Sequence, residues 1–170
     1  MARVDDPKNP HTFVEFAKRI ITGNQNIQFI WAGDGKYLEQ MRAKVKLLHL
    51  ESHIQFIGHI NDKDALLCQA DLYFSTSYYE GLPFAVIEAM SYGVPLLLSN
   101  NFGHQDLVKN NINGQLYNLN DFKTVSEFIN TIYYNEEKKA YLSTNSYKLF
   151  KENFSIEMML KNTEDLYLKA

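Results

Sequence analysis

The sequence predicts an α/β fold in which helices cover both faces of a parallel sheet. Five apolar runs of strand length, at residues 26–32, 53–57, 72–75, 94–99 and 115–117, alternate with stretches of helical periodicity or capping residues. Several runs are continuously apolar, as in Val-Pro-Leu-Leu-Leu at 94–98, which is typical of a strand buried on both sides. Together these two observations predict a doubly wound parallel sheet.

The helices that connect these strands are expected at residues 10–21, 36–48, 62–70, 84–92 and 104–109, with three more from Asp121 to the C-terminus. Pro83 suits the first turn of its helix, and Asp62 suits an N-cap. Residues 2–4 look like the stub of a further strand. We therefore expect the chain to be truncated at its N-terminus, because a strand that starts mid-sheet would leave backbone groups unpaired.

Length and composition narrow the class of protein. A chain of 170 residues with 45% hydrophobic content suits one domain. The net charge of −3 and the scattered cations argue against nucleic-acid binding. The single cysteine, Cys68, lies in an apolar helical stretch, where we expect it to be buried and without a redox role. No apolar run approaches the roughly 20 residues that span a bilayer, and no signal peptide is evident, so we expect a cytoplasmic protein.

Ligands of an open parallel sheet bind beyond the carboxyl ends of its strands, so the residues that follow each strand are the candidates for a site. Arg3 and Lys8 lie five positions apart on one loop and could both reach a diphosphate, although surface charge is the alternative. Gly33 and Gly35 could let backbone approach a ligand or form a tight turn. A third glycine is missing, and no acidic residue follows the next strand, which argues against a nicotinamide cofactor.

The most specific segment carries two carboxylates, Glu80 in a loop and Glu88 in the following helix. If the helix starts near Pro83, Glu88 lies about 7 to 8 Å along its axis. The positive end of the helix lies between the two glutamates and favours a phosphate. The pair could therefore grip a sugar at one end of an extended ligand and a ribose at the other. The alternative is that both are ordinary solvated residues.

Polar residues also follow the strand at 94–99, where Ser99, Gly103 and His104 would form another wall of the same crevice, and His104 could cap or line it. No metal site is expected. The Asp62-Lys63-Asp64 run matches a metal-binding signature but fits a helix N-terminus better, and the five histidines lack metal-ligand spacing.

These segments resemble, in order and spacing, those of the family-4 retaining glycosyltransferases. The donor half of that family carries an Arg…Lys pair, a Glu-x7-Glu motif and the run Glu-Ala-Met-x-x-Gly-x-Pro. Here these are Arg3 with Lys8, Glu80 with Glu88, and residues 88–95. The resemblance covers nearly the whole chain. It implies that residues 1–170 are the Rossmann-like, nucleotide-sugar-binding C-terminal half of a GT-B fold, ending in helices, without the N-terminal acceptor-binding domain.

The resemblance also implies roles for individual residues. Arg3 and Lys8 would bind the diphosphate and stabilise its developing charge, while Glu80 would hold hydroxyls of the donor sugar; these are the expected catalytic residues. Glu88 would accept from the ribose hydroxyls, and His59 would border the base. The full set of expected donor-binding residues is Gly33, Gly58, His59, Gly81, Leu82, Pro83, Phe84 and Glu88. Neither a metal nor another cofactor is expected, and the role of Asp106, where the family has a glutamate, stays open.

The implied function is transfer of a hexose from a nucleotide diphosphate sugar, such as a UDP-sugar, to an acceptor hydroxyl in cell-surface polysaccharide or glycolipid synthesis. The full-length enzyme would work in the cytoplasm and could associate peripherally with the inner face of the membrane. The fragment alone is expected to be inactive, because the acceptor half completes the site. The alternatives are a non-catalytic nucleotide-sugar-binding subunit or sensor and a nicotinamide-dependent oxidoreductase.

Overall fold

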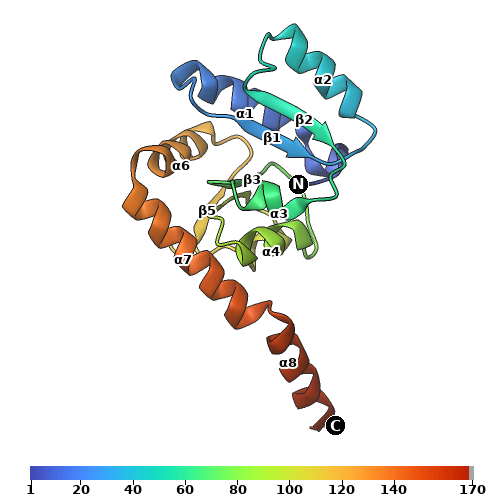
Figure 1. Ribbon diagram of the computed structural model, residues 1–170, viewed down its shortest axis with the longest axis vertical. Helices are drawn as coiled ribbons and strands as arrows, with labels where there is room; N and C mark the ends of the chain where they lie inside the picture. Colours follow the sequence, from blue (N-terminus) through green and yellow to red (C-terminus); the bar gives the residue numbers. More distant parts are fainter. Residues whose placement is uncertain (169–170) are drawn as a thin grey trace.

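The computed structural model describes residues 1–168, within which five strands alternate with helices and three helices end the chain (Figure 1). The elements, in order, are the short 3-10 helix η1 (Asp6–Lys8), α1 (Pro10–Gly23), β1 (Phe29–Ala32), α2 (Leu38–Leu47), β2 (Ile54–Gly58), α3 (Lys63–Leu67), β3 (Tyr73–Ser75), α4 (Phe84–Ser91), β4 (Leu96–Ser99), α5 (Phe102–Gln105), β5 (Gly114–Tyr117), α6 (Phe122–Tyr134), α7 (Glu136–Asn153) and α8 (Ile156–Leu168).

All strand pairings are parallel, as predicted. β1 pairs with β2, and β3, β4 and β5 form a second group in that order. The N-terminal segment connects the two groups. The Ala2 backbone N–H donates to the Ala32 carbonyl (2.9 Å) at the end of β1, and the Thr76 hydroxyl after β3 donates to the Lys8 carbonyl (3.1 Å). The expected strand stub at residues 2–4 therefore lies beside β1 but has no regular strand structure.

Helices cover both faces of the sheet, because neighbouring side chains of β4 enter different cores. Leu97 belongs to a cluster that includes residues of α1 and α6, whereas Leu96 and Leu98 belong to a cluster that includes residues of α3 and α4. All four residues of β4 are buried. This arrangement explains the continuously apolar run at 94–98 and confirms the doubly wound architecture.

Two helices, α3 and α5, differ most from their predicted bounds, and one residue differs in burial. The Asp62 side chain caps α3 by accepting from the Ala65 N–H (3.0 Å), as expected, but the helix ends at Leu67 and leaves Cys68 exposed. The prediction that Cys68 is buried was wrong. α5 covers residues 102–105 instead of 104–109, because the Asn101 side chain accepts from the His104 N–H (3.2 Å) and starts the helix earlier.

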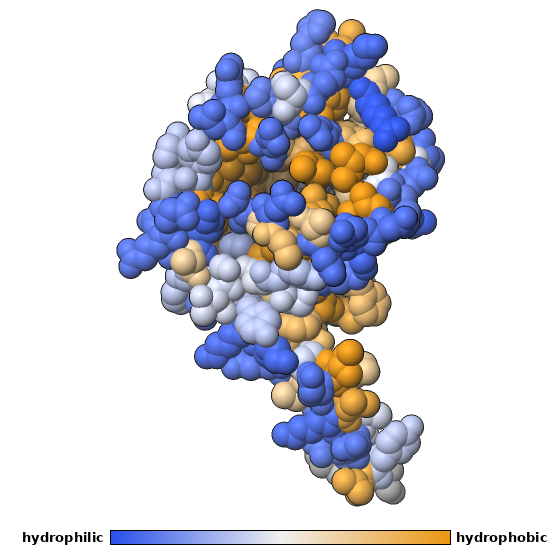
Figure 2. All heavy atoms as spheres, viewed as in Figure 1, coloured by the Kyte–Doolittle hydropathy of each residue, from blue (hydrophilic) through white to orange (hydrophobic). Residues whose placement is uncertain are grey.

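The three C-terminal helices were predicted correctly. α6 and α7 pack against each other and against the sheet domain, whereas α8 extends away from it (Figure 1). None of the residues of α8 is buried, and its surface carries both hydrophobic and hydrophilic side chains (Figure 2). No helix within residues 1–168 is both long enough and apolar enough to cross a lipid bilayer.

Candidate functional site

The site is built around an ion pair between Lys8 and Glu80, which lie 72 positions apart in the sequence. Lys8 ends η1, and Glu80 lies in the loop between β3 and α4. The Lys8 Nζ lies 2.6 Å from both carboxylate oxygens of Glu80. The two side chains are only 21% and 10% exposed. The structure thus joins a predicted diphosphate-binding cation to the predicted sugar-binding carboxylate, largely out of water.

Backbone contacts hold the two loops of this pair together. The Thr76 hydroxyl is buried and donates to the carbonyls of Lys8 (3.1 Å) and Asn9 (3.0 Å). The Tyr78 N–H donates to the Pro7 carbonyl (2.9 Å). The chain that leaves β3 towards Glu80 is therefore fixed against the chain that carries Lys8, at the carboxyl edge where parallel sheets bind ligands.

Glu88 lies in α4 and pairs with Lys63, the first residue of α3, at 2.5 Å. Both side chains are well exposed, so this pair contributes little to stability and can open readily. The first turn of α4 has no capping side chain from the described residues, although its Val86 N–H donates to the Pro83 carbonyl (2.9 Å). Glu80 and Glu88 lie on either side of this turn in the sequence.

Both glutamates act on the same buried group. Burial raises the pKa of the Tyr73 hydroxyl, and the charges of Glu80 and Glu88 raise it further. The charges of both carboxylates therefore act on one side chain of β3, and a shared donor site for the pair stays a prediction.

Arg3 stands apart from the Lys8–Glu80 pair. Its guanidinium forms an ion pair with Asp5 (3.1 Å), and its side chain is 77% exposed. Among the described residues its charged partner is Asp5 and not Glu80. The structure leaves the predicted role of Arg3 as a prediction.

The predicted donor-binding glycines Gly33, Gly58 and Gly81 differ in backbone conformation and in the space around them. Gly33 has a φ of 145°, and a Cβ there would lie 1.9 Å from the Ala2 carbonyl oxygen. Gly33 is thus required by the close passage of the N-terminal segment. Gly58 has a φ of 77° and accepts from the Gly33 N–H (2.7 Å), whereas a Cβ on Gly81 would meet no atom within 4 Å. Donor binding by these three glycines stays a prediction.

Most of the remaining predicted donor-binding residues are exposed. His59, Leu82 and Phe84 are exposed, and Pro83 is half-buried as the N-cap of α4. Asp106 is also exposed. Their side chains are accessible to a ligand, but their contacts with a donor stay predictions.

Sequence reasoning missed a buried polar network that lies beneath the Glu80 loop. The Ser99 hydroxyl (2.5 Å) and the Asn101 amide (3.2 Å) both donate to the Ser77 carbonyl. His104 is fully buried, and its Nδ1 donates to the Ser99 carbonyl (2.7 Å). Burial lowers the pKa of His104, which keeps the ring neutral. The only sequence signal was the group of polar residues directly after the buried strand at 94–99.

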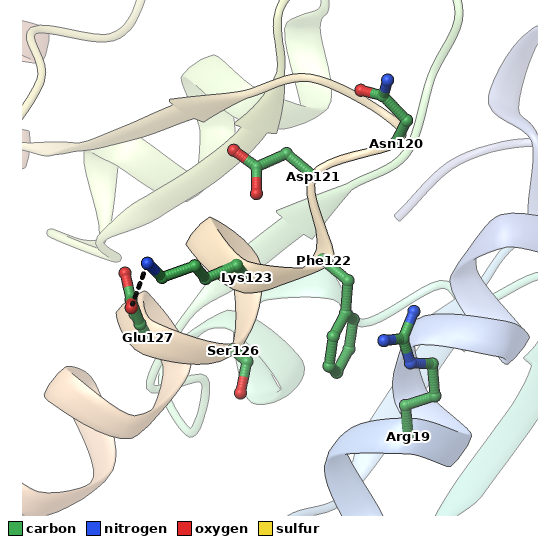
Figure 3. A pocket seen from close by; sticks show the side chains of 7 residues that line it. All are labelled: Arg19, Asn120, Asp121, Phe122, Lys123, Ser126 and Glu127. Atoms are coloured by element: carbon green, nitrogen blue, oxygen red, sulfur yellow. Dashed lines mark ion pairs between the residues drawn. The ribbon is translucent and has the colours of Figure 1, made fainter.

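A separate cavity of about 580 Å³ lies between α1 and the start of α6 (Figure 3). The Arg19 guanidinium lies 3.6 Å from the ring centroid of Phe122, and Lys123 pairs with Glu127 (3.8 Å) across its wall. It contains none of the predicted site residues. Within residues 1–168, no group of three or more His, Cys, Asp or Glu side chains could hold a metal ion.

Comparison with known sequences finds a matching family model and several relatives. Residues 1–149 match the family model of the glycosyl transferases group 1. The chain is 31% identical over 99% of its length to the UDP-Gal:alpha-D-GlcNAc-diphosphoundecaprenol alpha-1,3-galactosyltransferase of Escherichia coli, and covers 44% of it. It is 30% identical over 86% of its length to a GalNAc-diNAcBac-PP-undecaprenol alpha-1,4-N-acetyl-D-galactosaminyltransferase of Campylobacter jejuni, covering 41%. The chain thus spans less than half the length of these relatives.

Solved structures share the fold at low sequence identity. The chain superposes over its full length on 48% of Anabaena HepE, crystallised with UDP, with a TM-score of 0.90 and 21% identity. It also superposes over 92% of its length on the C-terminal domain of the glycosyl transferase group 1 protein LpcC of Francisella tularensis (TM-score 0.80, 18% identity, 84% of that chain). These are domains of the GT-B fold. Together with the family match, they establish that this chain belongs to the glycosyl transferases group 1 family.

Proposed function

We propose that this chain is the donor-binding domain of a retaining glycosyltransferase, which moves a hexose from a UDP-sugar to an acceptor hydroxyl in cell-surface polysaccharide or glycolipid synthesis. The observation that carries the proposal is the Lys8–Glu80 pair, held at the carboxyl edge of the sheet beside the loop that leads to the uncapped start of α4. The names of the relatives support uridine as the base and undecaprenyl-linked sugars as the acceptor class.

In the proposed complex Lys8 and Glu80 separate, and each binds a group of the donor instead. Lys8 moves from Glu80 to the diphosphate, where its ammonium and the N–H groups of α4 stabilise the charge that develops as the glycosidic bond breaks. Glu80 accepts hydroxyls of the sugar instead. Because neither group is left unpaired, the exchange avoids the large cost of an isolated buried charge.

Similar exchanges complete the donor site. Glu88 gives up exposed Lys63 for the ribose hydroxyls, and Arg3 leaves Asp5 for the diphosphate. Gly58 and His59, at the end of β2, border the base. In this proposal the cations and the helix dipole serve where other glycosyltransferases use a metal.

The proposed activity also needs an acceptor-binding domain, which the greater length of the relatives supports. Closure of two domains over a donor excludes water and completes the site. We therefore expect the isolated chain to bind UDP-sugars without transferring them at the rate of an enzyme.

A melting-temperature panel tests the proposal. The panel comprises UDP, GDP, ADP, NAD, UDP-galactose and UDP-N-acetylgalactosamine, and a ligand at 100 times its Kd adds about 2.7 kcal/mol to stability. We expect uridine nucleotides to raise the melting temperature of the chain most. A shift with NAD alone would contradict the proposal and favour the oxidoreductase.

The variant Glu88→Gln tests, in the same panel, whether Glu88 binds the ribose. We expect this variant to reduce the shift with every uridine nucleotide, because the ribose is common to them all. Glu127→Gln is the matched control, since it also removes an exposed Lys–Glu pair, that of Lys123 and Glu127, but away from the site. Equal shifts in both variants would remove Glu88 from the site.

A further inference from the structure

The polar residues that follow β4 are buried and form several hydrogen bonds with one another and with the loop that carries Glu80. Ser99, Asn101 and His104 are all buried, and their donors converge on two carbonyls, those of Ser77 and Ser99. The Asn101 Oδ1 accepts from the His104 backbone N–H (3.2 Å), and the Asn101 amide nitrogen lies 3.4 Å from the Ser99 hydroxyl oxygen. Burying this many polar groups costs free energy unless each finds a partner. In the described part of the chain, the His104 Nε2 has none.

The network reaches the Glu80 loop by two routes. The first is the Ser77 carbonyl, three residues before Glu80, which accepts two hydrogen bonds from it. The second is Gly103, where a Cβ would lie 2.2 Å from the Gly81 oxygen and 2.6 Å from the Glu80 oxygen. The start of α5 therefore lies directly against the backbone that carries the Glu80 carboxylate.

The other side of the same loop is fixed to Lys8. Thr76 and Tyr78, which flank Ser77, bond to the carbonyls of Lys8, Asn9 and Pro7. The segment 76–78 is thus held from one side by the cation's loop and from the other by the network after β4. The same three residues thus connect the network to the loop of Lys8 just before Glu80.

We propose that Ser99, Asn101 and His104 are positioning residues that set the position of Glu80 for the donor sugar, through the Ser77 carbonyl and the Gly103–Gly81 contact. This inference rests on the proposed function and adds to it, since it assigns recognition of the sugar, as distinct from the nucleotide, to residues that do not touch the donor. The network contacts the loop that carries Glu80, the proposed sugar-binding residue, whereas Glu88 lies on α4 and the proposed base-binding residues lie at the end of β2.

The test uses the UDP-sugar that the unmodified chain binds more tightly, either UDP-galactose or UDP-N-acetylgalactosamine. Calorimetry on the 170-residue chain gives the Kd for this UDP-sugar and the Kd for UDP. The quantity compared between variants is the first Kd divided by the second. Ser99→Ala removes the hydroxyl that bonds to the Ser77 carbonyl. Ser146→Ala is the matched control, because it removes a buried hydroxyl that bonds to the Val94 carbonyl (2.9 Å) beyond the opposite end of β4. Both variants lose a buried hydroxyl that donates to a main-chain carbonyl; the Ser99 hydroxyl oxygen also lies 3.4 Å from the Asn101 amide nitrogen and from the His104 Nδ1.

We expect Ser99→Ala to raise the ratio about tenfold, the equivalent of one hydrogen bond's worth of sugar contact, with the Kd for UDP within about twofold. Ser146→Ala should lower the melting temperature comparably and leave the ratio unchanged. His104→Phe and His104→Asn provide a second pair, since the amide of Asn retains an N–H donor near the Ser99 carbonyl and Phe does not. The ratio should rise for Phe and stay near the original for Asn.

The outcomes separate the two proposals. If the chain binds neither UDP nor a UDP-sugar, the proposed function fails. If it binds both, but Ser99→Ala and His104→Phe shift the ratio no more than Ser146→Ala, the network is merely structural and this inference alone is overturned.

Discussion

Among single residues, Lys8 and Glu80 form the ion pair of the proposed site, and both side chains are mostly buried. Each side chain is at most about one-fifth exposed, so each charge depends on the other for compensation. Exposed pairs such as that of Lys63 and Glu88 have water as an alternative partner and contribute little. The two kinds of pair should respond differently to mutation.

Lys8→Met should lower the free energy of unfolding by roughly 2 kcal/mol, because it leaves the Glu80 carboxylate largely buried without a cation. Adding Glu80→Gln in the same chain should recover part of that loss, since the uncompensated charge is gone. Denaturant unfolding of both single variants and the double variant measures the coupling. Strictly additive losses would mean that the pair does not stabilise the apo chain.

The burial of His104 predicts how the free energy of unfolding depends on pH. Burial lowers its pKa in the folded chain, so as the pH falls the unfolded chain takes up this proton first. Its contribution to stability is therefore complete above about pH 6.5, the ordinary value for histidine, and is lost as the pH falls below it. The difference in unfolding free energy between the unmodified chain and His104→Asn should shrink or change sign towards acid. A pH-independent difference would contradict a neutral buried ring.

The sequence suggests which charged residues are candidates for the site but not which residues they pair with. Lys8 and Glu80 are candidates because each follows a predicted strand, and Glu88 because it lies in the helix after Glu80; both features are local. The partners Asp5 for Arg3 and Lys63 for Glu88 depend on where loops pass one another, as does the contact of Ser99 with Ser77. Polar residues after a strand have several equivalent local uses, so the network could not be predicted.

At the scale of elements, strands were located to within three residues because continuous apolar runs mark buried β-structure directly. Helix ends were harder. α5 begins at Phe102, directly after its cap Asn101, and α3 has only 5 residues and ends at Leu67. Cys68 and Ala70 continue the apolar pattern beyond the end of α3, whereas the Asn101 cap starts α5 two residues before the predicted start, so apolar periodicity alone fixes neither boundary.

The contact between α5 and the Glu80 loop leads to a prediction at this scale. Gly103→Ala would place a Cβ 2.2 Å from the Gly81 oxygen, so the helix or the loop must move. We expect a loss of about 2 kcal/mol, in the range of overpacked cores. Gly23→Ala is the control, because a Cβ there meets nothing within 4 Å. Similar melting temperatures for the two variants would show that the α5 contact is loose.

α8 should be dispensable for the stability of the sheet domain. None of the residues of this helix is buried, so removing residues 156–170 deletes little packed surface. We expect the shortened chain to melt within about 2 °C of the full chain, a change corresponding to well under 1 kcal/mol. A large fall in melting temperature, followed by circular dichroism, would place α8 within the cooperative unit.

At the scale of the whole molecule, the doubly wound architecture could be predicted because the alternation of elements and the apolar strands agree. The division of the strands into two groups could not. It arises where the N-terminal segment passes between the ends of β1 and β3 with irregular backbone, closely enough to require Gly33. The same passage brings Lys8 to Glu80, so the feature that interrupts the sheet also assembles the site.

The most direct test of the central claim is a crystal structure of the chain with a UDP-sugar bound. We predict that the Lys8 Nζ leaves the Glu80 carboxylate for the diphosphate, while Glu80 accepts hydroxyls of the sugar and Glu88 those of the ribose. A complex in which the Lys8–Glu80 pair remains closed, with the nucleotide bound elsewhere on the molecule, would contradict the account.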